Sequence, residues 1–182
     1  MAQALDFAHK HGVLHRDVKP SNLVVDESGK AWVTDFGLAR IEDQPQLTVT
    51  GALVGTLRYM SPEQAMSERV VVDHRTDIYS LGVTLYELLT LRTPFIGDDK
   101  HSLLQQITSE EPHPPRHFNR SVPIALQNIV MKAIAKNPND RYVTAKDLAD
   151  DLQRFLDGTA VLARPRRAFH GLSVTHRSSL QR

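Results

Sequence analysis

One polar stretch, H-R-D-V-K-P-S-N from His15 to Asn22, constrains this chain more than any other part of its sequence. It brings an acid, two bases, a proline and an amide into one short segment. Two further motifs follow in order, Asp35-Phe36-Gly37 and Ser61-Pro62-Glu63. The pattern D-x-x-x-x-G from Asp77 and a late arginine, Arg141, complete the series. Each motif alone has little specificity because short patterns arise by chance, whereas their combination in this order is highly specific.

In this order the motifs resemble the catalytic loop, the metal-binding D-F-G and the end of the activation segment of a eukaryotic-type Ser/Thr protein kinase. The forms M-S-P-E-Q at 60–64 and D-I-Y-S-L-G at 77–82 are similar to bacterial members of that family. The resemblance covers residues 1–156 and only the C-terminal lobe of such a kinase. One small departure is Ser61, where the A-P-E motif of the family has alanine.

The resemblance implies a chemical role for several residues around the polar stretch. Asp17 matches the catalytic aspartate that accepts the proton of the substrate hydroxyl, and Lys19 matches the lysine that contacts the transferred phosphate in Ser/Thr kinases. Asn22 and Asp35 match the two magnesium ligands, and both offer the hard oxygen donors that Mg²⁺ prefers. Val24 matches the apolar residue beneath the adenine of ATP. The expected cofactors are therefore ATP and Mg²⁺.

The resemblance also implies regulation by phosphorylation. In kinases with an arginine before the catalytic aspartate, the position of Arg16 here, this arginine pairs with a phosphorylated residue of the activation loop. A phosphate on Thr48 or Thr50 would add about −1.5 to −2 charges for Arg16 to bind. We therefore expect autophosphorylation, the alternative being that both are ordinary loop threonines. Thr56 instead matches the threonine that hydrogen-bonds the catalytic aspartate and lysine, so its expected role is structural within the site.

Four residues match supporting positions of the family and are not expected to touch the reacting atoms. Glu63 and Arg141 match a buried ion pair that fastens the activation segment to the late helices. Asp77 matches the helix aspartate that holds the backbone of the catalytic loop. His15 is expected to pack in the core and form a hydrogen bond, and not to bind a metal ion.

Apolar periodicity and capping signals predict the secondary structure. Helices are expected over 2–11, 76–89, 100–108, 126–134 and 144–155. Short strands are expected at 13–14, 23–25 and 31–33, and a loop over 38–60. Capping boxes are expected at Ser61 with Gln64 and at Thr144 with Asp147. The predicted fold is mainly α (α+β), a kinase-like C-lobe in which a helical bundle carries a small β-sheet at the catalytic edge and the N-lobe is absent.

Composition and charge place further limits on the chain. Residues 1–156 are predicted to form the partial kinase domain, and residues 157–182 a basic, flexible tail, because five arginines and no acid follow Asp157. No nucleic-acid partner is expected. The absence of cysteine fits a reducing, cytoplasmic compartment, and no apolar run is long enough to span a membrane. A longer parent protein of the bacterial type would often be membrane-anchored.

Nothing before His15 matches the Gly-rich loop, the V-A-I-K lysine or its glutamate partner, which belong to the N-lobe of a kinase. We expect transfer of the γ-phosphate of ATP to Ser or Thr hydroxyls of proteins, with weak ATP binding and little turnover by this chain alone. The missing N-lobe, or an upstream chain, is thus an expected partner beside ATP and protein substrates.

Two alternatives remain open from the sequence. The first is a non-catalytic kinase-lobe interaction module. The second is a small-molecule phosphotransferase of the aminoglycoside type, although such enzymes lack the activation segment that ends in S-P-E. Whether the chain is a kinase or a non-catalytic kinase lobe, an apolar face that includes Val24 and Phe36 is expected to be uncovered where an N-lobe would dock.

Overall fold

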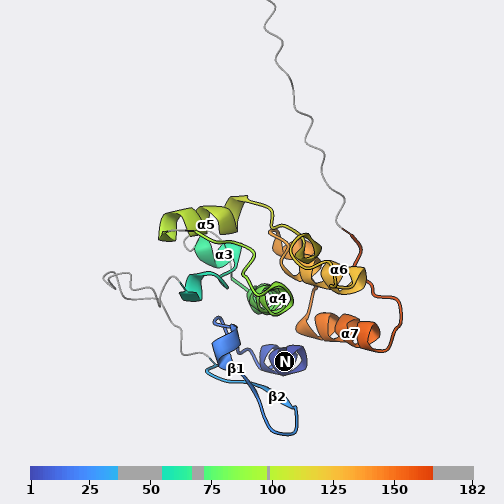
Figure 1. Cartoon of the computed structure of the whole chain (residues 1–182). Helices are drawn as coiled ribbons and strands as arrows, with labels where there is room; N and C mark the ends of the chain where they lie inside the picture. Colours follow the sequence, from blue (N-terminus) through green and yellow to red (C-terminus); the bar gives the residue numbers. More distant parts are fainter. Residues whose placement is uncertain (37–54, 67–71, 98, 166–182) are drawn as a thin grey trace, which may run out of the picture.

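In the computed structural model, which describes residues 1–36, 55–66, 72–97 and 99–165, the helices gather around one central helix, α4 (Figure 1). The helices are α1 (Ala2–Lys10), α3 (Pro62–Ala65), α4 (Arg75–Thr90), α5 (Lys100–Ser109), α6 (Ile124–Ala133) and α7 (Ala145–Leu156). Short 3-10 turns are η1 (Pro20–Asn22), η2 (Pro115–His117) and η3 (Pro138–Asp140). Figure 1 shows α4 end-on, with α3 and α5 on one side and α1 on the other. The predicted mainly α fold is confirmed.

The central position of α4 follows from its sequence, which is largely apolar. Its side chains Ile78, Tyr79, Val83 and Tyr86 are fully buried, and so are the polar Asp77 and Thr84, as expected for a helix that other elements cover. Gly82 lets α6 approach closely, because a Cβ atom there would lie 2.8 Å from the Cβ atom of Ala133. The helix therefore forms the axis of the core, and the other elements are positioned relative to it.

The small sheet is an antiparallel hairpin of β1 (Leu23–Val25) and β2 (Ala31–Val33). Its register pairs Leu23 with Val33 and Val24 with Trp32. The third predicted strand, Val13-Leu14, does not form. The N–H of Val13 donates instead to the carbonyl of Ala8 at the end of α1, so this segment continues the helix end and joins no strand.

Capping signals in the sequence place the ends of three helices correctly. Ser61 and Thr144 each form a capping box with the residue at N3, as predicted, and begin α3 and α7. Asp99 begins α5, where its side chain accepts a hydrogen bond from the N–H of Ser102 at 2.8 Å. Among the residues described, no helix combines the length and the apolar character that crossing a membrane requires.

A buried ion pair fastens α3 to the segment before α7. Both terminal nitrogens of the Arg141 guanidinium donate to the Glu63 carboxylate, at 2.6 and 2.7 Å. Arg141 also donates to the backbone carbonyls of Arg75, Ala135 and Lys136. Both side chains are almost completely buried, so their charges depend on one another and on these hydrogen bonds. The geometry is that of the ion pair expected from the sequence.

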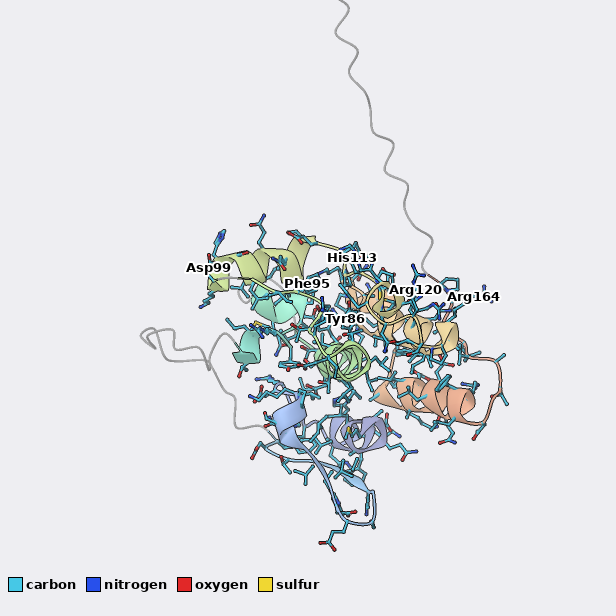
Figure 2. The ribbon with its side chains drawn as sticks, in the orientation of Figure 1. Tyr86, Phe95, Asp99, His113, Arg120 and Arg164 are labelled. Atoms are coloured by element: carbon cyan, nitrogen blue, oxygen red, sulfur yellow. The ribbon has the colours of Figure 1, made fainter. Side chains whose placement is uncertain are left out.

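The packed part of the chain continues past Leu156. The fully buried carboxylate of Asp151 accepts hydrogen bonds from the hydroxyl of Tyr142 at 2.7 Å, and from the N–H groups of Leu162 and Ala163 at 2.6 and 2.9 Å. Burial, followed by the hydrogen bond to Asp151, raises the pKa of the Tyr142 hydroxyl. Ala163 itself belongs to the main core. Figure 2 shows Arg164 beside α6, directly after this attachment.

We predict that Arg141→Met destabilises the chain by about 3–5 kcal/mol, because it leaves the buried Glu63 carboxylate without its partner. The exposed pair Lys146–Asp150 provides the control, since Lys146→Met removes a salt bridge worth about 0–1 kcal/mol. Urea unfolding of both variants measures the difference. Equal midpoints for the two variants would show that the buried ion pair does not hold α3 in place.

The hairpin turn yields a prediction about pH. Hydrogen bonds from Ser28, from the indole of Trp32 and from the backbone of Lys30 lower the pKa of Asp26 to about 2. A carboxyl with a lowered pKa stabilises the fold above its unfolded pKa of about 3.9, and this contribution is lost as the pH falls through the folded value.

The indole N–H signal of Trp32, the only tryptophan, should therefore titrate in NMR spectra with a midpoint near pH 2, and Asp26→Asn should abolish that titration. A midpoint near the ordinary aspartate pKa of about 4 would contradict this arrangement.

Candidate active site

The polar loop from His15 to Asn22 is held in shape by one buried carboxylate of α4. The Asp77 Oδ2 atom accepts the N–H of His15 at 2.8 Å, and Oδ1 accepts the N–H of Arg16 at 2.7 Å. Arg16 has a φ of 65°, in the left-handed region, which costs a non-glycine residue about 1 kcal/mol or more. The two hydrogen bonds offset this cost and set the direction in which Asp17 leaves the loop.

A further residue, His9, supports Asp77 and was not identified from the sequence. Its Nε2 atom lies 2.8 Å from the Asp77 Oδ2 atom, and its ring is largely buried. The sequence does indicate that His9 is largely buried, because it lies on the same face of α1 as the buried Ala2, Leu5 and Asp6, at helical spacing. Which carboxylate that face would meet depends on the packing of α1 against α4 and could not be deduced from spacing alone.

Four of the predicted site residues form one hydrogen-bonded network. Lys19 Nζ lies 2.8 Å from the Asp17 Oδ2 atom and 3.1 Å from the hydroxyl of Thr56. The Asn22 side-chain amide donates to the Asp17 carbonyl at 2.8 Å and to Asp17 Oδ2 at 3.1 Å. Within the described part of the chain, Asp17 Oδ1 accepts no hydrogen bond. The network thus holds one carboxylate oxygen and leaves the other open.

The hairpin and His15 together hold Thr34, the residue before Asp35, next to Asn22. The N–H of Thr34 donates to the carbonyl of Asn22 at 2.9 Å, which continues the ladder of the two strands, and the Thr34 hydroxyl donates to the same carbonyl at 3.3 Å. The Nδ1 atom of His15 accepts the N–H of Asp17, so its Nε2 atom donates to the Thr34 carbonyl at 2.8 Å. Thr34 is therefore held from both sides. This role could not be predicted because most of these contacts are made by backbone atoms of Thr34.

Asn22 and Asp35 offer oxygen donors of the kind that Mg²⁺ prefers. Among the described residues, the Asn22 Oδ1 atom accepts only a long hydrogen bond, 3.3 Å, from the hydroxyl of Ser21. The Asp35 carboxylate is exposed and receives no hydrogen bond from the described residues, on a backbone with a φ of 60°. Mg²⁺ binds few protein oxygens and retains water or phosphate oxygens as its other ligands. The described residues hold no cluster of three His, Cys, Asp or Glu side chains.

The two residues expected on an uncovered apolar face, Val24 and Phe36, differ in how far their side chains are exposed in the structure. Val24 is 48% exposed, as expected. Phe36 is half-buried, so its expected exposure is wrong: its ring lies 4.6 Å from the ring of His15 and packs against the main core. The imidazole of His15 provides an aromatic neighbour for Phe36 within this lobe. Trp32, which pairs with Val24 across the hairpin, and Val25 are exposed as well.

The predicted phosphorylation sites Thr48 and Thr50 lie outside the described residues, as does Gly37 of the D-F-G motif. The partner proposed for a phosphate, Arg16, is described. Its side chain is exposed and forms no ion pair with the described residues, while its carbonyl accepts the side-chain amide of Gln64 at 3.3 Å. Arg16 thus lies beside α3, the helix that follows the undescribed segment.

We predict that Asp77→Ala lowers the free energy of unfolding by about 2–5 kcal/mol, because two backbone N–H groups lose their buried acceptor. Hydrogen exchange of the Arg16 amide should accelerate more than that of Ile129 in α6. Adding Arg16→Gly should recover about 1 kcal/mol, since glycine adopts the left-handed conformation without strain. The control is Asp150→Ala on the exposed side of α7. An unchanged Arg16 exchange rate in Asp77→Ala would contradict the assignment.

The sequence is similar to that of known proteins across this whole site. The model of the protein kinase domain family matches residues 1–152. The serine/threonine-protein kinase PknB of Mycobacterium leprae is 46% identical over 157 residues, which cover 86% of this chain and 25% of that protein. A probable serine/threonine-protein kinase of Clostridium perfringens is 43% identical over 154 residues, covering 85% of this chain and 22% of the relative.

A probable serine/threonine-protein kinase of Streptomyces coelicolor is 42% identical over 161 residues, covering 87% of this chain and 24% of the relative. The chain spans about a quarter of the length of these relatives. The matched residues include every described residue of the network around Asp17. By its sequence and by the motifs that its fold brings together, the chain belongs to the protein kinase domain family.

Proposed function

We propose that this chain is the catalytic C-lobe of a Ser/Thr protein kinase, which transfers the γ-phosphate of ATP to Ser or Thr hydroxyls of proteins. The observation that carries the proposal is the network in which Lys19 and Asn22 bind one oxygen of Asp17 and leave the other open. A half-exposed apolar residue, Val24, lies on the adjoining hairpin. A carboxylate in this setting suits proton acceptance, since it is fixed in place yet accessible.

In this mechanism Asp17 Oδ1 accepts the proton of the substrate hydroxyl, and Oδ2 stays bound to Lys19 and Asn22. The Lys19 ammonium group lies close enough to Asp17 to contact the phosphoryl group as it arrives at the hydroxyl. Thr56 fixes Lys19 by accepting one of its hydrogen bonds. The positions of these groups, more than their acidity, provide the rate enhancement, because a loose transition state requires little covalent assistance.

The phosphate groups would be held by Mg²⁺ on the oxygens of Asn22 and Asp35, and the adenine would rest on Val24. When bound, MgATP supplies the transferred phosphoryl group and neutralises the charge that develops on its oxygens. The exposed Val24, Val25 and Trp32 fit a surface that a second lobe covers, and this lobe would enclose ATP from the other side. We therefore propose that the C-lobe alone binds ATP weakly.

Autophosphorylation of Thr48 or Thr50 is the regulation we propose. The exposed guanidinium group of Arg16 has no ion-pair partner among the described residues, and the backbone carbonyl of Arg16 accepts a hydrogen bond from Gln64 of α3. A phosphothreonine would supply the missing anion through charge-assisted hydrogen bonds. Binding there would connect the undescribed segment to the backbone that precedes Asp17, and hence to the catalytic carboxylate.

Two substitutions test the proposed function. With a small lobe from a relative fused ahead of Met1, we predict that Asp17→Asn lowers phosphate transfer from labelled ATP at least about 100-fold, because the general base is lost. In the chain alone, calorimetry should detect weak, magnesium-dependent ATP binding that Asp35→Asn abolishes. Asp150→Asn, on the exposed side of α7, is the matched control and should change neither measurement.

The non-catalytic alternative predicts a different result from the same experiment. A pure interaction module would bind the small lobe through its apolar hairpin yet show no phosphate transfer with intact Asp17. Transfer that persists at the same rate in Asp17→Asn would exclude the catalytic role given to this carboxylate. Neither result depends on a change in the fold, so the experiment tests the chemical role of Asp17 separately from the structure.

A further inference from the structure

Arg58 is a positively charged residue on a rigid turn beside the candidate active site. The turn is closed by the N–H of Tyr59, which donates to the Thr56 carbonyl at 3.2 Å, and Leu57 is buried in the core. On its other side, the hydroxyl of Ser80 donates to the Tyr59 carbonyl at 2.8 Å. The backbone that carries Arg58 is thus fixed on both sides.

The guanidinium group of Arg58 has no anionic partner in the described part of the chain. Its Nε atom is buried without a hydrogen-bond partner, although the residue is only half-buried. Three carboxylates of this region are already engaged: Asp17 by Lys19 and Asn22, Glu63 by Arg141, and Glu87 by the hydroxyl of Tyr59. A partly buried guanidinium without a partner is unfavourable and is well suited to bind an anion from outside.

The position of Arg58 relative to Asp17 follows from the hydrogen bonds of its neighbours. Thr56, two residues before Arg58, accepts a hydrogen bond from Lys19, whose ammonium group lies 2.8 Å from Asp17. The carbonyl of Tyr59, the next residue, accepts the hydroxyl of Ser80, one turn after Asp77 in α4. Two residues of chain and the length of an arginine side chain together span up to about 15 Å, which an extended peptide, rising about 3.3 Å per residue, covers in about five residues.

On the basis of the proposed function, we propose that Arg58 selects substrates, by binding an acidic side chain located within about five residues of the phosphorylated Ser or Thr. The guanidinium group presents paired N–H donors that match a carboxylate or a phosphate group. The carboxylate of Glu87 does not favour a basic side chain at the same place, because it already binds Tyr59 and lies within the field of Arg58. The substrate class is therefore an acidic protein segment.

Peptide binding tests this proposal without requiring phosphate transfer. Labelled peptides contain one Ser in a neutral background, with a single Glu placed at each position on either side, and matched peptides carry Gln or Lys instead. Fluorescence anisotropy with the chain of 182 residues, at low salt, measures their affinities. We expect Glu at one position, within about five residues of Ser, to tighten binding about fivefold over Gln.

Two variants of Arg58 and one control assign the effect to this side chain. Arg58→Gln should remove the preference for Glu while leaving the Gln peptide unaffected. Arg58→Glu should reverse the preference toward Lys at the same position. Arg154→Gln, a half-exposed arginine on α7, is the matched control and should retain the preference for Glu. Equal thermal midpoints would show that the variants remain folded.

The source of the anion is tested by Thr48→Ala together with Thr50→Ala. If the preference for acidic peptides persists in this variant, the anion belongs to the substrate. A preference that appears only in this variant would overturn the proposal, because Arg58 of the unsubstituted chain would then bind the protein's own phosphothreonine. Equal binding of Glu, Gln and Lys peptides, a preference for Lys, or no binding of any peptide would also overturn it. Phosphate transfer is measured separately with Asp17→Asn. Failure of the proposed function would therefore be distinguishable from failure of the role proposed for Arg58.

Discussion

The arrangement of this lobe depends on the buried carboxylate of Asp77. Its two oxygens accept the N–H groups of His15 and Arg16, and His9 lies within hydrogen-bonding distance of the oxygen that accepts His15. Without these contacts the left-handed conformation of Arg16 would relax, and Asp17 would leave the loop in another direction. A single side chain on α4 thus links the position of a core helix to the direction in which Asp17 leaves the loop.

The same helix also positions the substrate side of the site. Ser80, one turn after Asp77, donates to the Tyr59 carbonyl, and Glu87 accepts the hydroxyl of the same tyrosine. Near its end, Tyr86 donates to the carbonyl of His113, and Figure 2 shows the two labelled residues on neighbouring elements. Because all these contacts come from one rigid rod, the catalytic loop and the turn of Tyr59 cannot shift independently.

Local chemistry made much of this fold predictable. Caps at Ser61 and Thr144 depend on residues three positions apart, so sequence alone identifies them. The pairing of Glu63 with Arg141 followed only from family resemblance, since no local rule joins residues so distant in the chain. Val13-Leu14 failed as a strand because β-branched and apolar residues can also pass from a helix into a loop. Apolar content there did not reveal that the Val13 N–H would bind α1.

The parts of the site that sequence could not predict involve contacts between elements. Thr34 acts mainly through its backbone, with a longer hydrogen bond from its hydroxyl, and no side-chain pattern marks such a role. The exposure of Phe36 was misjudged because its neighbour, the ring of His15, becomes adjacent only after the hairpin folds back. His9 lay on a recognisable helical face, yet its partner depended on how α1 meets α4. Periodicity identifies a buried face but does not identify what covers it.

The attachment of Leu162 and Ala163 to Asp151 limits which sites a group attached after Ala163 can reach. It fixes the point from which residues after Ala163 start. Figure 2 places Arg164 beside α6, and Figure 1 shows α6 across the molecule from the hairpin. A group tethered close behind that point has a low effective concentration at the Asp17 of its own molecule, because a short linker cannot pass around the lobe. Such a group would meet the active site of a neighbouring molecule more readily than its own.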